Sequence, residues 1–106
     1  MQLSLVGFVL QRLLNLAGVT TTGVAKFQKL FQSVQPEAII VEEAAEVLEA
    51  HIVAALSPAT KHLVLIGDHE QLRPSTAVYR LSTQYNLDVS LFERLVRNGI
   101  EQVTVV

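Results

Sequence analysis

Uninterrupted apolar runs mark two places where the chain should form buried strands. The first run covers residues 38–41 (AIIV) and the second covers residues 62–66 (HLVLI). Strands that are apolar on both faces are typical of parallel sheets, in which crossover helices cover the two sides. The pattern therefore predicts an α/β fold with a parallel sheet whose strands are buried on both faces.

Around these runs, apolar residues recur at helical spacing, which indicates amphipathic helices. The predicted helices cover residues 1–16, 24–34, 44–56 and 91–97, with a weaker one over 76–84. Pro36 stops the second of them, and Ser90 and Glu93 have the spacing of a capping box before the fourth. Residues 19–22 are all β-branched and favour a short extended stretch, and residues 103–106 favour another strand.

Composition narrows the class of protein. Half of the 106 residues are hydrophobic, 17% are charged, and the mean hydropathy is +0.39. A small independent domain normally has a more polar exterior, so we expect the middle of a larger α/β domain. The absence of cysteine excludes disulfide scaffolds and thiolate metal sites. A net charge of −2 excludes a polybasic nucleic-acid arm but leaves a local patch open.

A membrane partner is not expected. The apolar run over residues 3–10 is too short to cross a bilayer, and polar residues follow it. A membrane-surface role of the first helix is kept as a minor alternative.

Acidic residues follow both predicted strands. Glu42 and Glu43 come directly after the first, and Asp68 follows the second. Ligands of open parallel sheets bind outside the carboxyl ends of the strands, so these carboxylates should share one rim if the strands are neighbours. Such carboxylates suit a hydrated Mg²⁺ on a phosphate-bearing substrate, where one holds the metal's water shell and another polarises the attacking water. Acidic residues that merely start a helix are the simpler alternative for Glu42 and Glu43.

Two segments at these strand ends resemble motifs of superfamily-one helicases. Residues 39–46 (IIVEEAAE) are similar to the Walker B box, or motif II, and residues 67–74 (GDHEQLRP) are similar to motif III. Residues 19–27 (VTTTGVAKF) look like motif Ic, and residues 90–96 (SLFERLV) look like the segment after motif III. The resemblance is strongest to the branch of senataxin and the nonsense-mediated-decay helicase. Within that branch, it is strongest to the RNA helicases with zinc fingers of the nuclear transcription factor X type.

This resemblance implies that residues 17–106 belong to a partial first motor domain with a RecA-like (P-loop NTPase) fold, while residues 1–16 form an unassigned amphipathic helix. ATP and Mg²⁺ are the implied cofactors in the intact parent. The implied partners are RNA, or DNA, and the remainder of the motor domains. The implied compartment is the cytoplasm or the nucleus.

The resemblance also assigns roles to eight residues of the chain. They are Glu42 for magnesium, Glu43 for catalytic water activation, Gln71, Asp68 and Arg73 for the nucleotide, and Thr21, Thr22 and Lys26 for the nucleic-acid backbone.

The chain departs from the family pattern in several ways. The commonest motif II opens with Asp and ends with Gln, whereas this chain has Glu42 and Glu46, and Glu70 adds negative charge near the phosphates. The phosphate-binding loop GxxxxGKS/T occurs nowhere in the sequence, and neither does a second motor domain. We therefore expect descent from an ATP-dependent RNA helicase, but negligible ATPase activity and no unwinding by this chain. The alternative is a non-catalytic remnant that binds RNA or a protein.

The aromatic residues are expected to pack in the core. Phe27, Phe31 and Phe92 fall at helical spacings and are expected in the core. Tyr79 and Tyr85 could stack on bases, but packing is the favoured interpretation.

Overall fold

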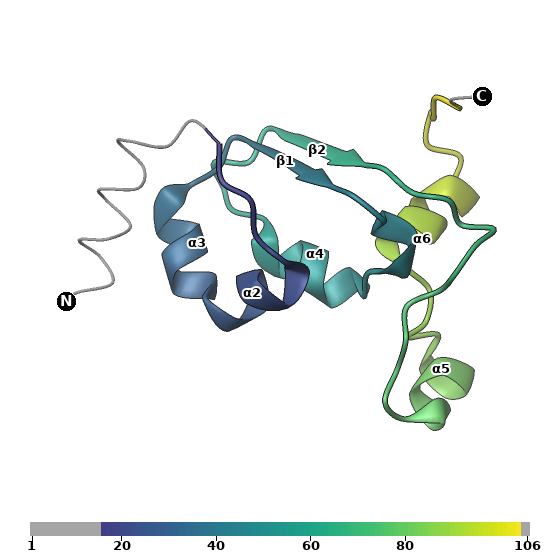
Figure 1. Ribbon diagram of the computed structural model, residues 1–106. Coiled ribbons are helices and arrows are strands. Elements are labelled where there is room, and N and C mark those ends of the chain that lie inside the picture. Colours follow the sequence, from purple (N-terminus) through teal and green to yellow (C-terminus); the bar gives the residue numbers. More distant parts are fainter. Residues whose placement is uncertain (1–15, 105–106) are drawn as a thin grey trace. The chain divides into compact units, whose positions relative to one another are not determined.

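The computed structural model describes residues 16–104 of the chain (Figure 1). Its elements are α2 (Thr21–Lys26), α3 (Gln28–Val34), β1 (Ala38–Val41), the 3₁₀ helix η1 (Ala44–Glu46), α4 (Glu49–Ala55), β2 (His62–Leu65), α5 (Tyr79–Tyr85) and α6 (Leu91–Arg97). The helix predicted over residues 1–16 lies outside the described residues, apart from Leu16, which has no regular structure. The strand predicted over 103–106 is wrong for residues 103 and 104, and the last two residues lie outside the described part.

The two strands are hydrogen-bonded neighbours in one sheet. Near the start of the pair, the amides of Lys61 and His62 donate to the Glu37 carbonyl, and at its end the Ile66 amide donates to the Val41 carbonyl. The strands therefore run in the same direction, as Figure 1 shows, and η1 and α4 form the crossover between them. The predicted α/β class with a parallel sheet is confirmed for these elements.

The two faces of the sheet differ in burial. Ile39 and Val41 are buried, whereas Ile40 is 64% exposed and Val64 is 47% exposed. The prediction that both faces of the strands are buried is therefore wrong for the described residues.

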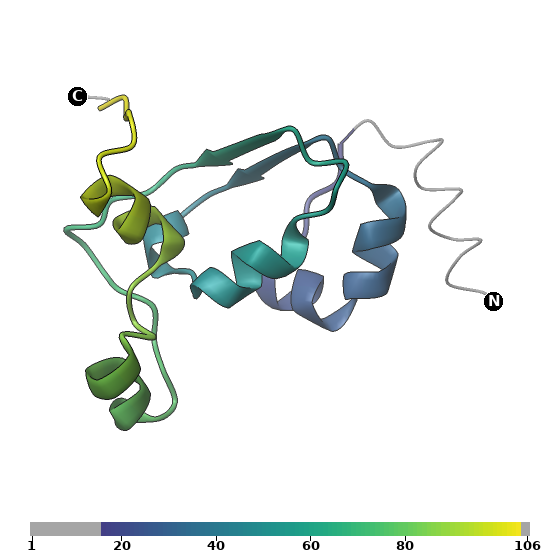
Figure 2. The ribbon, with the colours of Figure 1, turned by 180° about the vertical axis from the view of Figure 1, so that it is seen from behind.

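The chain divides into two compact units. The first consists of the residues up to 40 and residues 50–64, and the second consists of residues 41–49 and the residues from 65 onward. In the first unit, the helices lie on one side of the strands in both views (Figures 1 and 2). This one-sided cover explains why exposed and buried residues alternate along β1.

Two predicted elements near the N-terminal side differ from the structure. Thr21 and Thr22 are helical rather than extended, because the Thr20 side chain caps α2 by accepting a bond from the Gly23 amide at 3.0 Å. The helix predicted over 24–34 is divided at Phe27, which has non-helical dihedrals. Phe27 is also exposed rather than buried, and its ring lies 5.5 Å from the Lys26 ammonium.

The helix predicted over 44–56 is likewise divided. Its first turn is η1, Val47 is extended, and α4 begins only at Glu49. The Ala44 amide donates to the Ile66 carbonyl at 2.8 Å, so the first turn is held at the end of β2 and the chain must bend before α4. A tertiary hydrogen bond thus overrides good local helix propensity.

The last helix, α6, follows the sequence prediction closely. Ser90 is fully buried, and its hydroxyl accepts a hydrogen bond from the Glu93 amide at 3.0 Å. At the other end, Gly99 has φ of 76°, and the amides of Gly99 and Ile100 close a Schellman motif on the carbonyls of Val96 and Leu95. The capping box is only half formed, because the Glu93 carboxylate binds arginine side chains instead.

No helix in residues 16–104 combines the length and the apolar character needed to cross a membrane.

Candidate functional site

The structure brings the turn after β1 against the turn after β2, and both lie in the second unit. Ile66 donates to the Val41 carbonyl at 2.9 Å and accepts from the Ala44 amide at 2.8 Å. A Cβ atom on Gly67 would lie 2.9 Å from the backbone nitrogen of Ala45, so only glycine allows this close approach. The segment that carries Glu42 and Glu43 is therefore tied to the segment that leads into Asp68.

Glu42 and Glu43 are both exposed on this edge. No group in residues 16–104 donates a hydrogen bond to either carboxylate, and Glu43 makes no capping bond to η1. Glu43 adopts a left-handed backbone conformation, with φ of 52° and ψ of 38°. This conformation is uncommon for a residue with a Cβ and costs roughly 1–2 kcal/mol. A role as simple helix-start residues does not account for this strained and unpaired arrangement.

Asp68 organises the loop after β2. Its Oδ1 accepts a hydrogen bond from the Glu70 amide and its Oδ2 accepts one from Gln71 Nε2, both at 2.9 Å. The bond from Gln71, followed by the bond from the Glu70 amide, lowers the pKa of the Asp68 carboxyl. Asp68 is thus ionised at neutral pH and positions the Gln71 carboxamide.

Arg73 follows in the same loop but binds toward α6. Its Nη2 donates to Glu93 Oε1 at 2.9 Å, and its Nη1 lies 3.7 Å from Asp88 Oδ2. Glu93 is only 4% exposed and also accepts a bond from Arg97. Sequence reasoning missed this buried carboxylate, although the i, i+4 spacing of Glu93 and Arg97 was a usable signal. The loop of Asp68 and Gln71 is therefore anchored to α6 through Arg73.

The three residues expected to contact nucleic acid lie in α2, in the first unit. Thr21 is half-buried, whereas Thr22 and Lys26 are exposed. All three stand on this one short helix.

Within residues 16–104, no group of three or more Asp, Glu or His side chains is placed to hold a metal ion. Magnesium on a nucleotide needs only one or two carboxylates, because phosphates and waters supply its other ligands. The unpaired carboxylates of Glu42 and Glu43 fit that requirement.

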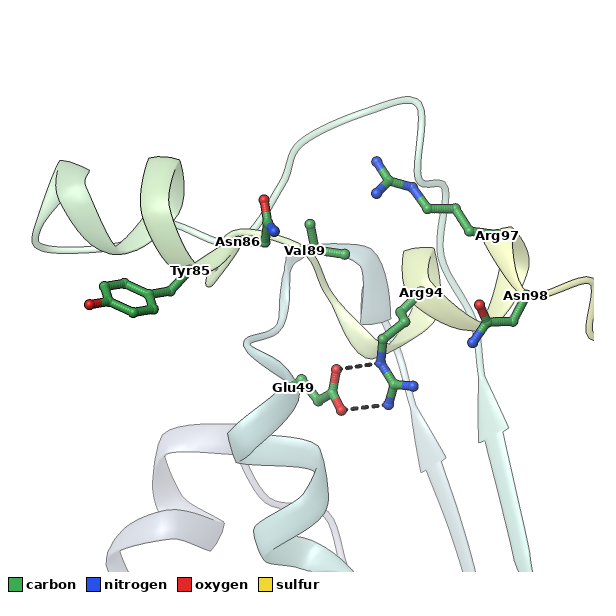
Figure 3. Close-up of a pocket in the computed structure, with 7 residues that line it drawn as sticks. All are labelled: Glu49, Tyr85, Asn86, Val89, Arg94, Arg97 and Asn98. Carbon is green, nitrogen blue, oxygen red and sulfur yellow. Dashed lines mark hydrogen bonds and ion pairs between the residues drawn. The ribbon is translucent and has the colours of Figure 1, made fainter.

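A second feature of this unit is a hollow of about 480 Å³ beside α5 and α6 (Figure 3). It is lined by Glu49, Tyr85, Asn86, Val89, Arg94, Arg97 and Asn98. Arg94 forms a bidentate pair with Glu49, at 2.9 Å from Nε and 2.6 Å from Nη2. The hydrogen bonds from Arg94 lower the pKa of Glu49, and Glu49 in turn raises the pKa of Arg94. None of the residues assigned a role from the sequence lines this hollow.

Comparison with known proteins identifies the class of this chain. Its residues 11–78, more than half of its length, match the family described as "AAA domain". The chain therefore belongs to the AAA domain family, which implies a P-loop NTPase-like fold.

Its relatives narrow the class to helicases. The chain is 61% identical over 86 residues to NFX1-type zinc finger-containing protein 1 of Mus musculus, which is 81% of the chain and 4% of the relative. It is 46% identical over 94 residues to "Helicase required for RNAi-mediated heterochromatin assembly 1" of Schizosaccharomyces pombe, which is 88% of the chain and 9% of that relative. It is 33% identical over 67 residues to "Regulator of nonsense transcripts 1" of Caenorhabditis elegans, which is 63% of the chain and 6% of that relative. The predicted resemblance to superfamily-one helicases is confirmed, and the chain spans less than a tenth of each of these relatives.

Proposed function

We propose that this chain supplies the metal and phosphate edge of an ATP-dependent RNA helicase motor domain. The observation that carries the proposal is the backbone link between the two turns, made by Ile66 with Val41 and Ala44 and by the close approach of Gly67. This link puts the unpaired carboxylates after β1 beside the ordered loop after β2. Membership of the AAA domain family and helicases among the relatives support the same assignment.

Within this edge, each side chain has a distinct role. Glu42 would hold magnesium, which when bound neutralises charge on the phosphate oxygens. Glu43 accepts a proton from the attacking water, for which an exposed and unpaired carboxylate is suited. Gln71 contacts the terminal phosphate, and Asp68 fixes the orientation of its carboxamide through the 2.9 Å bond. Arg73 holds this loop to Glu93 and contributes to nucleotide binding through that anchoring.

Nucleic acid is the proposed second ligand of the intact domain. Thr22 and Lys26 are exposed on α2 and can donate hydrogen bonds to phosphate oxygens, with half-buried Thr21 beside them. The chain itself carries no GxxxxGKS/T loop, so we propose that it hydrolyses ATP only within a domain that supplies this loop.

A chimaera tests the proposal directly. The matching segment of the Schizosaccharomyces pombe helicase is exchanged for residues of this chain, and RNA-stimulated ATP hydrolysis is measured. Glu43→Gln should lower the hydrolysis rate on the order of 10²- to 10⁴-fold, the usual contribution of a general base. Glu101→Gln is the matched control, because Glu101 is exposed, lies outside both acidic turns and should leave the rate unchanged. A folded chimaera without ATPase activity, or equal losses in the two variants, would contradict the proposal.

A further inference from the structure

Two side-chain contacts join the loop after β2 to α6, and all the residues involved belong to the second unit. The rings of His69 and Phe92 have centroids 6.2 Å apart, a separation within the usual range for ring pairs. Arg73 Nη2 donates to Glu93 Oε1 at 2.9 Å. Gln71 lies midway in sequence between the two loop residues, and the two α6 residues are consecutive. The loop is therefore attached to one turn of α6 on both sides of Gln71.

Apolar burial does little to hold this loop. From Ile66 to Val89, Pro74 is the only buried residue. That stretch includes α5, whose rings of Tyr79 and Tyr85 are 80% and 72% exposed, so the expected packing of the tyrosines in the core is wrong. A segment with so few buried contacts opens easily unless other contacts hold it. The position of the loop beyond its first residues therefore depends on Pro74 and on the two contacts to α6.

Glu93 has two arginine partners, and only one of them belongs to the loop. The carboxylate is 4% exposed, and its Oε1 accepts hydrogen bonds from both Arg73 and Arg97. The side chains of the two arginines are 50% and 57% exposed, so their surroundings are similar in that respect. Arg97 lies in α6 itself, four residues after Glu93. A buried carboxylate without a cation is costly, and the second arginine keeps Glu93 paired when the loop arginine is removed.

The helix that carries Glu93 is well fixed within the second unit. The fully buried Ser90 caps α6, and Leu91 in its first turn is buried as well. The helix also packs against η1, which begins directly after Glu43. The same helix thus supports the turn that carries Glu43 and the loop that carries Gln71.

We propose that Glu93 is a positioning residue that acts through Arg73 and sets the preference of the nucleotide site for a triphosphate over a diphosphate. This role rests on the proposed function, in which Gln71 contacts the terminal phosphate. A loop that is fixed before the nucleotide binds loses less conformational entropy when Gln71 makes that contact. A diphosphate has no terminal phosphate, so the anchor on α6 strengthens the binding of the triphosphate alone.

The test uses the chimaera described above and measures the dissociation constants of a non-hydrolysable ATP analogue and of ADP. Arg73→Gln and Arg97→Gln form a matched pair, because each removes one arginine from the same oxygen of Glu93. Arg73→Gln should lower the preference for the ATP analogue on the order of 10-fold, about the contribution of one charge-assisted hydrogen bond. Glu93→Gln should lower it to a similar extent. Arg97→Gln should leave the preference unchanged, because it does not touch the loop.

A double-mutant cycle with Gln71→Ala separates positioning from general stability. In the Gln71→Ala background, Arg73→Gln should have no further effect on the preference, because the anchor acts through the Gln71 carboxamide. An unchanged preference in Arg73→Gln, the same loss with and without Gln71, or an equal loss in Arg97→Gln would each overturn the role of Glu93.

The cycle also distinguishes failure of this role from failure of the proposed function. If Gln71→Ala lowers the preference for the ATP analogue but Arg73→Gln does not, only the role of Glu93 is wrong. If Gln71→Ala itself leaves the preference unchanged, the contact of Gln71 with the terminal phosphate is wrong, and the role of Glu93 falls with it.

Discussion

Replacing Gly67 with alanine tests the packing that ties the two acidic turns together. The new Cβ would lie 2.9 Å from the Ala45 nitrogen and 3.1 Å from the Ala44 nitrogen, and these backbone atoms cannot rotate away. Overpacking of this kind costs roughly 1–3 kcal/mol. If the Ala44 amide also loses its bond to the Ile66 carbonyl, about 1 kcal/mol is added. We expect Gly67→Ala to lower the free energy of unfolding by about 2–4 kcal/mol in urea denaturation of the 106-residue chain.

Two other glycines provide matched controls for this experiment. Gly18 has no atom within 4 Å of an added Cβ, so Gly18→Ala should change stability by less than about 0.5 kcal/mol. Gly99 also faces open space but has φ of 76°, so Gly99→Ala should cost about 1–2 kcal/mol through backbone strain alone. If Gly67→Ala is no more destabilising than Gly18→Ala, or if hydrogen exchange at the Ala44 amide is unchanged, the reasoning is refuted.

Four further substitutions probe the core, two helix caps and an ion pair. Ile52 is 1% exposed, so Ile52→Ala should lower the free energy of unfolding by about 2–5 kcal/mol in the same assay, and a loss below about 1 kcal/mol would contradict its place in the core. Ser90→Ala should cost about 1–2 kcal/mol and expose the α6 amides to faster hydrogen exchange, whereas Thr20→Ala at the exposed cap of α2 should cost less. The pKa of Glu49 is lowered in the folded chain, so its contribution is present above its unfolded pKa of about 4.3 and is lost as the pH falls through the folded value. Glu49→Gln should therefore cost about 0.5 kcal/mol at pH 7, with the difference vanishing in acid, and a difference independent of pH would contradict the ion pair.

Features set by local pattern were predictable from the sequence. The apolar runs located β1 and β2, and their separation by a helical segment indicated a parallel pair. Ser90 and Gly99 marked both ends of α6, because capping depends on residues adjacent in sequence. The same reasoning placed Glu42, Glu43 and Asp68 at the carboxyl ends of neighbouring strands, where the structure has them.

Features set by tertiary contacts were not predictable in this way. The break at Val47 follows from the bond between the Ala44 amide and the end of β2, which no helix propensity records. The exposure of Ile40 depends on which elements cover the sheet, and the apolar run alone cannot show that. The burial of Glu93 between two arginines depends on how Arg73 folds back from its loop, twenty residues earlier in the sequence.

The left-handed backbone of Glu43 lowers the stability of its turn, whereas the proposed role in hydrolysis requires the carboxylate at this position. Glycine or asparagine would occupy that conformation with less strain. Each would therefore stabilise the turn but remove the carboxylate. Under the proposed role of Glu43, selection for thermal stability alone would therefore favour loss of this carboxylate, whereas selection for ATP hydrolysis would retain both the carboxylate and the strained turn.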